Sequence, residues 1–165
     1  MRIAGLTQDS IVDGPGLRFV VFTQGCRRRC EGCHNPETWD VHGGKETSCD
    51  DIIKEMLGNP LTDGLTISGG EPVLQAGECI QLATAAHEKR LNVWMFTGYT
   101  FEELATLSGS DPAISKLLGL VDVLVDGPYL STERTLQLKW RGSKNQRVVD
   151  VKKSLEAGAA VEYIS

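Results

Sequence analysis

The stretch Leu17–Pro36 reads LRFVVFTQGCRRRCEGCHNP, and it joins an apolar run to three closely spaced cysteines. Residues 17–23 are rich in β-branched and aromatic side chains, which favour a buried strand. Cys26, Cys30 and Cys33 follow shortly after this strand. Because α/β proteins place their chemistry at the carboxyl ends of strands, the sequence predicts a functional cluster of thiols at that position.

Short apolar strands and amphipathic helices alternate through the rest of the chain. Each strand ends in a Gly-rich turn, and this order is typical of a parallel sheet with right-handed crossovers. A further short strand and a helix are expected after residue 148. The remaining strands are predicted at residues 65–67, 92–96 and 121–125, and the helices at residues 50–57, 78–90, 101–107 and 112–118.

The length of the chain limits how much of a barrel can form. A complete eight-unit β/α barrel needs about 250 residues, and one βαβ unit takes roughly 30. We therefore expect one α/β domain that spans residues 1–165. Its expected fold is an incomplete parallel β/α barrel of about five or six units, open on one side.

Composition and charge argue against several classes of protein. Lys and Arg total 17 against 22 Asp and Glu, a net charge of −5, so we expect neither a nucleic-acid binder nor a membrane-surface binder. A transmembrane run of about 18 apolar residues and a cleavable N-terminal segment are both missing, so a cytoplasmic protein is expected. Five cysteines, an odd number with three crowded together, favour a metal site in a reducing compartment.

The spacing C-x3-C-x2-C allows two kinds of metal site. A structural zinc ion takes four protein ligands, so Cys49, His34 or His42 would complete the set in a zinc-stabilised binding module. His34 is a poor ligand because it adjoins Cys33. A [4Fe–4S] cluster held by three cysteines instead leaves one iron open, and an open iron can bind a substrate directly. The spacing alone leaves both alternatives open.

A second motif narrows the choice. Ser68–Pro72, SGGEP, follows the next predicted strand, and together with the C-x3-C-x2-C motif it resembles the radical S-adenosylmethionine (SAM) superfamily. Five further segments, which span nearly the whole chain, resemble the family of activating proteins of anaerobic ribonucleotide reductase. These segments are DGPGLR at 13–18, CHNPETW at 33–39, WMFTGY at 94–99, VLVDG at 123–127 and WRGSKNQ at 140–146.

The resemblance implies a radical SAM oxidoreductase with a protein substrate. It implies that Cys26, Cys30 and Cys33 ligate a [4Fe–4S] cluster, whose fourth iron is chelated by the amino and carboxylate groups of SAM. Cleavage of SAM then yields a 5′-deoxyadenosyl radical, which abstracts hydrogen from a glycine of anaerobic ribonucleotide reductase. The alternatives are an activase of another glycyl-radical enzyme and a small-molecule radical SAM enzyme.

An electron donor is the second partner that the resemblance implies. A reduced flavodoxin or a similar acidic protein would supply the electron that cleaves SAM. The basic run Arg27–Arg29 is a candidate for attracting such a donor, although a run of charges is more often a solvated loop surface.

The resemblance also implies SAM contacts near both motifs. Gly69 and Gly70 are expected to let the backbone approach the methionyl part of SAM. Glu71 is expected to accept a hydrogen bond from the ammonium group of SAM or from a neighbouring backbone amide. Asp126, at the end of a predicted strand, either orients SAM or a cation, or forms a turn.

Gly32 departs from the pattern of many relatives, which carry an aromatic residue before the third cysteine that packs on the adenine of SAM. The adenine contact is therefore expected from the backbone of Gly32, Cys33 and His34, or from a side chain elsewhere such as Tyr99. The sequence leaves the stacking residue unassigned.

Overall fold

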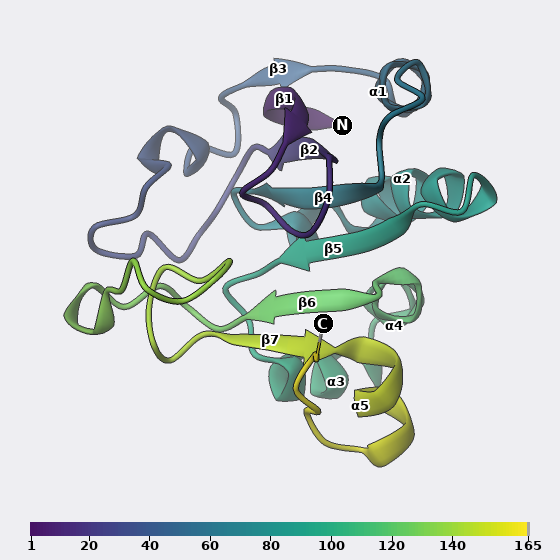
Figure 1. Cartoon of the computed structure of the whole chain (residues 1–165). Helices are drawn as coiled ribbons and strands as arrows, with labels where there is room; N and C mark the ends of the chain where they lie inside the picture. Colours follow the sequence, from purple (N-terminus) through teal and green to yellow (C-terminus); the bar gives the residue numbers. More distant parts are fainter. Residues whose placement is uncertain (165) are drawn as a thin grey trace.

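The computed structural model describes residues 1–164, which form a seven-stranded sheet with helices packed against it (Figure 1). The strands are β1 Arg2–Ser10, β2 Arg18–Thr23, β3 Lys45–Glu46, β4 Gly64–Gly69, β5 Asn92–Phe96, β6 Val123–Asp126 and β7 Arg147–Asp150. The helices are α1 Cys49–Leu57, α2 Ala76–Glu88, α3 Phe101–Ser108, α4 Pro112–Leu120 and α5 Val151–Ala157. All the strands and helices predicted between residues 17 and 125 are present, and their ends differ from the prediction by at most two residues.

The strands are ordered β3-β1-β2-β4-β5-β6-β7, and the four central strands β2, β4, β5 and β6 run parallel. Helices connect these parallel neighbours, which confirms the predicted α/β fold. β1, β3 and β7 pair antiparallel, so the prediction of a parallel sheet was wrong at both edges. A parallel pair needs a crossover connection, whereas residues 11–17 simply turn β1 back onto β2, and no crossover helix separates β6 from β7.

The sheet is open, and fewer units form than the sequence predicted. Three crossovers join the parallel strands, formed by α1, by α2 and by α3 with α4, instead of about five or six units. The reason is that residues 127–146 form loops and one short 3-10 turn rather than a further strand and helix. In Figure 1 these loops lie beside residues 24–44, at the end of the sheet to which the parallel strands point.

The helices pack on one face of the sheet and leave the other face to a smaller cluster. Alternate strand residues such as Phe19 and Met95 form the large core with the helices. On the opposite face, Trp94 packs edge-on against Trp140 and Tyr163, with ring centroids 4.8 Å and 5.4 Å apart. Among residues 1–164, this second face therefore carries no helix and is bordered by the loops at the strand ends.

Arg18 places a buried charge on this second face. Its guanidinium donates to the hydroxyl of Thr66 at 3.0 Å, to the carbonyl of Leu65 at 2.7 Å and to Oδ1 of Asn92 at 2.5 Å. Burial lowers the pKa of Arg18 to about 10, and the negative charge of Asp63 opposes this shift. The arginine thereby ties β2 to β4 and β5 at the amino ends of the parallel strands.

Polar side chains mark where four of the helices begin. Each accepts a hydrogen bond from a backbone amide in the first turn, which would otherwise lack an acceptor. The capping residues are Ser48 for α1, Thr100 for α3, Asp111 for α4 and Asp150 for α5. None of the helices within residues 1–164 has both the length and the apolar content required to cross a membrane.

Candidate metal centre

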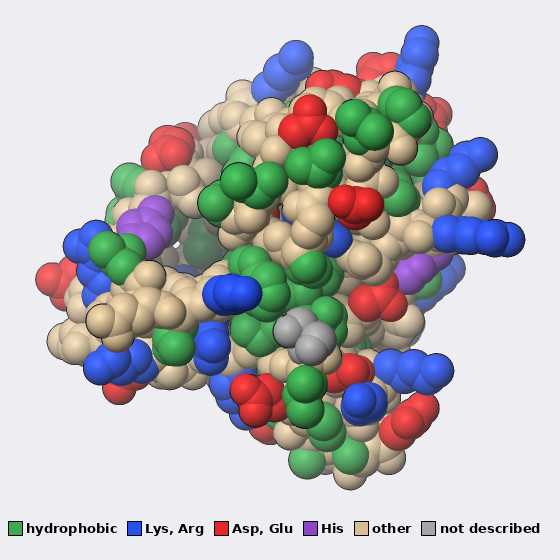
Figure 2. Space-filling view, viewed as in Figure 1, with side chains coloured by type: hydrophobic (Ala, Val, Ile, Leu, Met, Phe, Trp, Pro, Cys, Tyr) green, Lys and Arg blue, Asp and Glu red, His purple; other side chains and the backbone are tan. Residues whose placement is uncertain are grey.

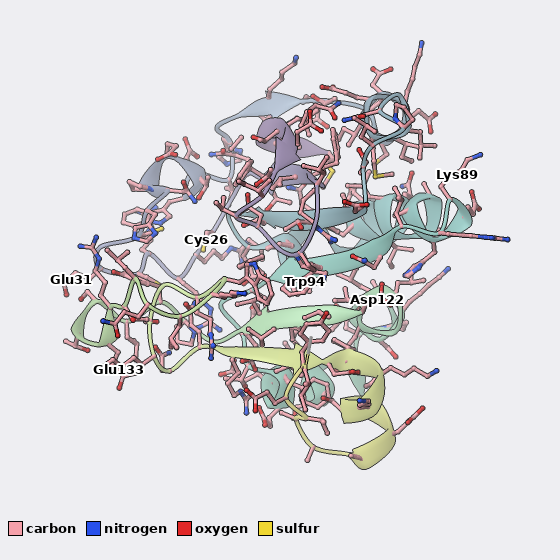
Figure 3. The ribbon with its side chains drawn as sticks, in the orientation of Figure 1. Cys26, Glu31, Lys89, Trp94, Asp122 and Glu133 are labelled. Atoms are coloured by element: carbon pink, nitrogen blue, oxygen red, sulfur yellow. The ribbon has the colours of Figure 1, made fainter. Side chains whose placement is uncertain are left out.

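The three closely spaced thiols lie at the carboxyl ends of the central strands. In Figure 3, Cys26 is found at this end with the loop residue Glu31 beyond it, whereas Lys89 lies at the opposite end of the sheet. Cys26, Cys30 and Cys33 are free thiols, each partly exposed. The prediction that a strand delivers these thiols to the end of the sheet is therefore confirmed.

The base of the thiol loop, residues 26–37, is closed by backbone hydrogen bonds. The amide of Gly25 donates to the carbonyl of Thr38 at 2.7 Å, and the amide of Cys26 donates to the carbonyl of Trp39 at 3.1 Å. Gly25 has a φ of +105°, a conformation that favours glycine, and the chain turns out of β2 at this point. The two ends of the thiol loop are thus held together beside β2.

The three thiols line one cavity of about 130 Å³, together with Gly69, Gly70 and Glu71. The structure therefore brings the thiol loop and the SGGEP segment together, as their positions after neighbouring strands predicted. Within residues 1–164, no three His, Cys, Asp or Glu side chains lie close enough together to hold a single metal ion, and the three thiols instead border a shared space. A set of three soft sulfur donors around such a space fits an iron–sulfur cluster.

Backbone amides donate hydrogen bonds to two of the three sulfurs, those of Cys33 and Cys26. The amide of Asn35 donates to Sγ of Cys33 at 3.4 Å. Burial raises the pKa of the Cys26 thiol, and hydrogen bonds from the amides of Arg28 and Arg29 oppose this rise. Hydrogen bonds to sulfur are one of the means by which a protein tunes an iron–sulfur cluster, so this arrangement suits the predicted ligands.

Gly69 and Gly70 bring the SGGEP segment against the backbone that precedes the thiols. The amide of Gly70 donates to the carbonyl of Thr23 at 2.8 Å, and the amide of Glu71 donates to the carbonyl of Gly25 at 2.7 Å. A Cβ at either glycine would overlap the backbone of residues 22–25. The glycines are thus needed for the close approach of two backbones, and their contact with SAM stays a prediction.

Glu71 is buried, and its carboxylate accepts hydrogen bonds from the amides of Val73 at 3.1 Å and Gly98 at 2.8 Å, and from the hydroxyl of Thr97 at 2.9 Å. Of the two kinds of donor predicted for Glu71, the structure shows the backbone amide. Burial raises the pKa of Glu71, and these hydrogen bonds and the charge of Arg28 oppose the rise. The carboxylate ties the end of β4 to the end of β5 beside the thiols.

Asp126 is only 1% exposed, and protein donors occupy its carboxylate. Oδ2 accepts from the amide of Phe101 at 2.7 Å, and the guanidinium of Arg147 donates to both oxygens. Arg147 also binds Glu102, so one arginine joins β6, β7 and the start of α3. These contacts give Asp126 a structural role, and its contact with SAM or a cation stays a prediction.

Gly32 lies against an aromatic side chain that the sequence reasoning missed. Gly32 has a φ of +76°, and a Cβ there would lie 3.4 Å from the ring of Tyr129. The rings of His34 and Tyr129 are 5.2 Å apart and tilted by 47°. Tyr99, the candidate from the sequence, packs instead against the guanidinium of Arg28 at 4.6 Å. The signal for Tyr129 was its position just after a strand that ends at the same edge as the thiols.

None of the residues considered for completing a zinc site, Cys49, His34 and His42, lines the cavity that the three thiols share. Cys49, in the first turn of α1, and Cys79, in α2, are both buried in the core on the helix side of the sheet. Burial raises the pKa of both thiols. His42 is exposed, and neither it nor the two buried cysteines lines the cavity that the three thiols share.

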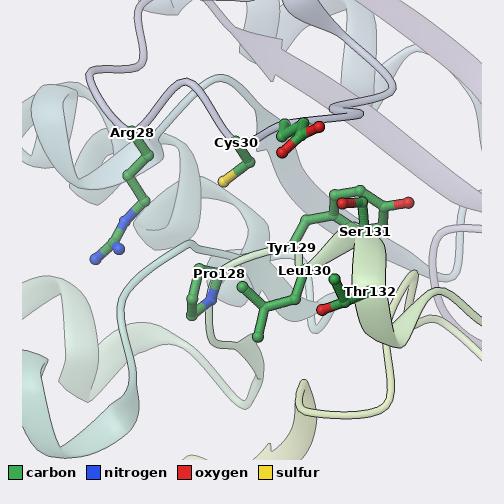
Figure 4. Close-up of a pocket in the computed structure, with 8 residues that line it drawn as sticks. Arg28, Cys30, Pro128, Tyr129, Leu130, Ser131 and Thr132 are labelled. Carbon is green, nitrogen blue, oxygen red and sulfur yellow. The ribbon is translucent and has the colours of Figure 1, made fainter.

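Two larger hollows adjoin the thiol cavity. The first, of about 420 Å³, separates Cys30 from the segment Pro128–Thr132, and Figure 4 shows the two facing each other. The second, which we call the substrate-side groove, has about 1190 Å³ and runs from Cys33 out to the exposed side chains of Ile11 and Leu136. In Figure 2 the surface is hollowed between the loop region and the body of the molecule. The thiol site is therefore reached from a wide opening.

Comparison with known proteins places this site in a family. Residues 12–149 match the family described as the 4Fe-4S single cluster domain. The anaerobic ribonucleoside-triphosphate reductase-activating protein of Enterobacteria phage T4 is 34% identical over 145 residues, which cover 83% of this chain and 86% of that protein. The protein of the same name from Vibrio cholerae is 35% identical over 144 residues, which cover 82% of this chain and 89% of that protein.

The names of a second group of relatives refer to another enzyme, pyruvate formate-lyase. The pyruvate formate-lyase 1-activating enzyme of Escherichia coli K12 is 35% identical over 160 residues, which cover 93% of this chain and 62% of that longer protein. The family match includes all three closely spaced cysteines and the SGGEP segment. The chain therefore belongs to the 4Fe–4S single cluster domain family and, within it, to the radical SAM activating enzymes of glycyl-radical enzymes.

Proposed function

We propose that this chain uses its [4Fe–4S] cluster and SAM to remove a hydrogen atom from a glycine of anaerobic ribonucleotide reductase, which leaves a glycyl radical on the reductase. The observation that carries the proposal is the cavity lined jointly by the three thiols and the SGGEP segment. The names of the phage T4 and Vibrio cholerae relatives support the choice of reductase.

The residues at the cavity fit the two cofactors. Cys26, Cys30 and Cys33 would hold three irons of the cluster and leave the fourth open to the amino and carboxylate groups of SAM. When both are bound, one electron from the reduced cluster cleaves SAM to methionine and a 5′-deoxyadenosyl radical, which takes the glycine hydrogen. Gly69, Gly70 and the carboxylate of Glu71 fix the strand end against which SAM would lie.

The shape of the opening supports a protein substrate rather than a small molecule. Small-molecule sites are mostly enclosed, whereas the substrate-side groove is wide and bordered by exposed apolar side chains. Ile11 and Val12 on one side are 73% and 71% exposed, and Leu136 on the other is 83% exposed. An extended loop of the reductase laid between them would cover these side chains and exclude water from the cluster.

The electron donor would approach the thiol loop from outside. Arg27 and Arg29 are exposed, whereas Arg28 packs on Tyr99 and lies 3.5 Å from a carboxylate oxygen of Glu103. The two exposed arginines flank the cluster ligands and would attract an acidic donor such as reduced flavodoxin. Raised ionic strength is then expected to slow the reduction.

A direct test is the transfer of the radical to the partner. Anaerobically reconstituted protein is mixed with SAM, a reductant and the reductase, and electron paramagnetic resonance detects the glycyl radical. The proposal expects a glycyl signal that requires all four components and that is lost in Cys30→Ala. A reductase that gains no radical, while the chain still cleaves SAM, would refute the assignment of the partner.

The second candidate is an activase of another glycyl-radical enzyme. The observation in its favour is the 35% identity to the pyruvate formate-lyase 1-activating enzyme over 93% of this chain. Pyruvate formate-lyase replaces the reductase in the same assay. A glycyl signal on the lyase alone would establish this alternative.

A further inference from the structure

We infer that Tyr129 forms the surface on which the adenine of SAM packs. The inference rests on the proposed function, since it assumes that SAM binds at the thiol cavity. It assigns the contact that Gly32, without a side chain, does not make. It also names an aromatic residue from a segment distant in sequence from both motifs.

Tyr129 is placed at the meeting point of the three cavities. It lines the thiol cavity with Gly69 and Glu71, the hollow next to Cys30, and the substrate-side groove next to Cys33. A ligand bound at the open iron would extend into one of these spaces. The ring is therefore within reach of the part of SAM that lies away from the cluster.

The Tyr129 ring lies against two glycines, and one of them, Gly142, leaves it the room that a side chain would take. A Cβ on Gly32 would lie 3.4 Å from Cε1 of the ring, which is ordinary contact. A Cβ on Gly142 would lie 3.1 Å from Cδ2 and 3.3 Å from Cε2, which is tighter than normal packing. The tyrosine thus lies between the thiol loop and residues 140–146, with its ring next to Gly32.

The segment that carries Tyr129 is held in place by its neighbours. The side-chain amide of Asn145 donates to the carbonyl of Pro128 at 2.8 Å, and the amide of Leu130 donates to the hydroxyl of Ser143 at 3.3 Å. The ring of His34 adds a second aromatic side chain beside it. Since the residues on both sides of Tyr129 are anchored, its backbone is positioned before any ligand binds.

The other aromatic side chains near the thiols have partners of their own. Tyr99 packs on Arg28, and the guanidinium of Arg29 lies 5.8 Å from the ring of Trp39. Trp140 packs on Trp94. Phe96 lines two of the cavities but also packs in the cluster on the second face of the sheet, so it is the rival for the adenine contact.

The test measures SAM binding to the reconstituted protein rather than its activity. Stacking of a base on an aromatic side chain contributes enough to change affinity by about tenfold or more when the ring is removed. We expect Tyr129→Ala to raise the Kd for SAM about tenfold with its iron content unchanged, and Tyr129→Phe to bind as wild type does. Glu133→Ala, an exposed residue of the same loop region, is the matched control and should bind normally.

Two further measurements separate a stacking role from general damage to the site. Methionine lacks the adenosyl group, so its effect on the electron paramagnetic resonance of the reduced cluster should survive in Tyr129→Ala. Gly142→Ala, which presses on the ring, should weaken SAM binding by a smaller factor than Tyr129→Ala.

Three results would overturn the inference. They are an unchanged Kd for SAM in Tyr129→Ala, an equal loss of SAM and methionine responses in that variant, and a loss of SAM affinity in Phe96→Leu but not in Tyr129→Ala. Each of these leaves the proposed function intact because wild type still binds SAM. Wild-type protein that holds iron but binds no SAM would overturn both.

Discussion

The hydroxyl of Thr97 lies 2.9 Å from each carboxylate oxygen of Glu71, and this contact joins the ends of β4 and β5 beside the thiol cavity. The same carboxylate also accepts hydrogen bonds from the backbone amides of Val73, on Oε2, and Gly98, on Oε1. Three donors, the hydroxyl of Thr97 and two backbone amides, therefore hold the SGGEP segment in place through one buried carboxylate. This carboxylate only accepts hydrogen bonds when it is ionised.

Glu71→Gln should destabilise the chain. A glutamine has a single acceptor oxygen, so its NH2 group would face one of the two amide donors and leave that amide unpaired. We expect the free energy of unfolding to fall by about 1–3 kcal/mol in urea titrations. Glu55→Gln, at an exposed position of α1, is the control and should change it by less than about 0.5 kcal/mol. Equal unfolding midpoints for the two variants would contradict this role.

Gly70→Ala and Gly77→Ala should have opposite effects. A Cβ on Gly70 would overlap the backbone of Gly25, so the SGGEP segment must move away from the thiol loop. A Cβ on Gly77, in α2, would meet nothing within 4 Å, and alanine favours the helix by about 1 kcal/mol. Thermal unfolding should show a lower midpoint for Gly70→Ala and a higher one for Gly77→Ala. A stable Gly70→Ala protein with full iron content would refute the close-approach argument.

The contribution of Glu102 should depend on pH. The hydrogen bond from Arg147 lowers the pKa of Glu102, so the folded state binds its proton less readily than the unfolded state does. The stabilisation is therefore present above the ordinary pKa of a glutamate and is lost as the pH falls through the lowered value. Because Glu102 is largely exposed, Glu102→Gln should cost less than about 1 kcal/mol at pH 7.

Urea titrations of wild type and Glu102→Gln from pH 7 downwards measure this difference. The gap in unfolding free energy should narrow as the pH is lowered below the usual glutamate range. Glu156→Gln, exposed on α5, serves as the control for general charge effects. If the difference in unfolding free energy between wild type and Glu102→Gln stayed constant with pH, the ion pair between Arg147 and Glu102 would not depend on the ionised form of Glu102.

Much of this fold could be predicted from the sequence. The apolar runs at β2, β4 and β5 are short, and a glycine follows each within two residues. The SGGEP segment follows one of these runs, so the meeting of the two motifs was predictable. The antiparallel direction of the edge strand β7 could not be predicted. Residues 147–150 have the same apolar character whichever way the strand runs. Its direction depends on the missing crossover helix rather than on local composition.

The contacts of the site residues were less predictable than their positions. Asp126 was correctly placed at a strand end, but its partner Arg147 lies on the neighbouring strand and nothing local in the sequence links them. Tyr129 was overlooked for the same reason, since its contact with Gly32 joins two loops distant in sequence. Long-range pairs of this kind depend on how loops fold over the sheet.

The three loop cysteines and the two buried ones should differ in their effect on iron content. Cys26→Ala, Cys30→Ala and Cys33→Ala should each lose most of the iron after anaerobic reconstitution, since each removes a proposed ligand. Cys49→Ala should keep it, because Cys49 is buried in the helix-side core. Loss of metal in Cys49→Ala, with zinc rather than iron bound by wild type, would support a zinc site instead.

The central claim is that three thiols hold a cluster whose fourth iron is open to SAM. The most direct measurement is the electron paramagnetic resonance spectrum of the reduced, reconstituted protein recorded without and with SAM. We predict an iron–sulfur signal that changes when SAM is added, because SAM adds ligands to the open iron. A spectrum that SAM leaves unchanged, from protein with its full iron content, would contradict the account.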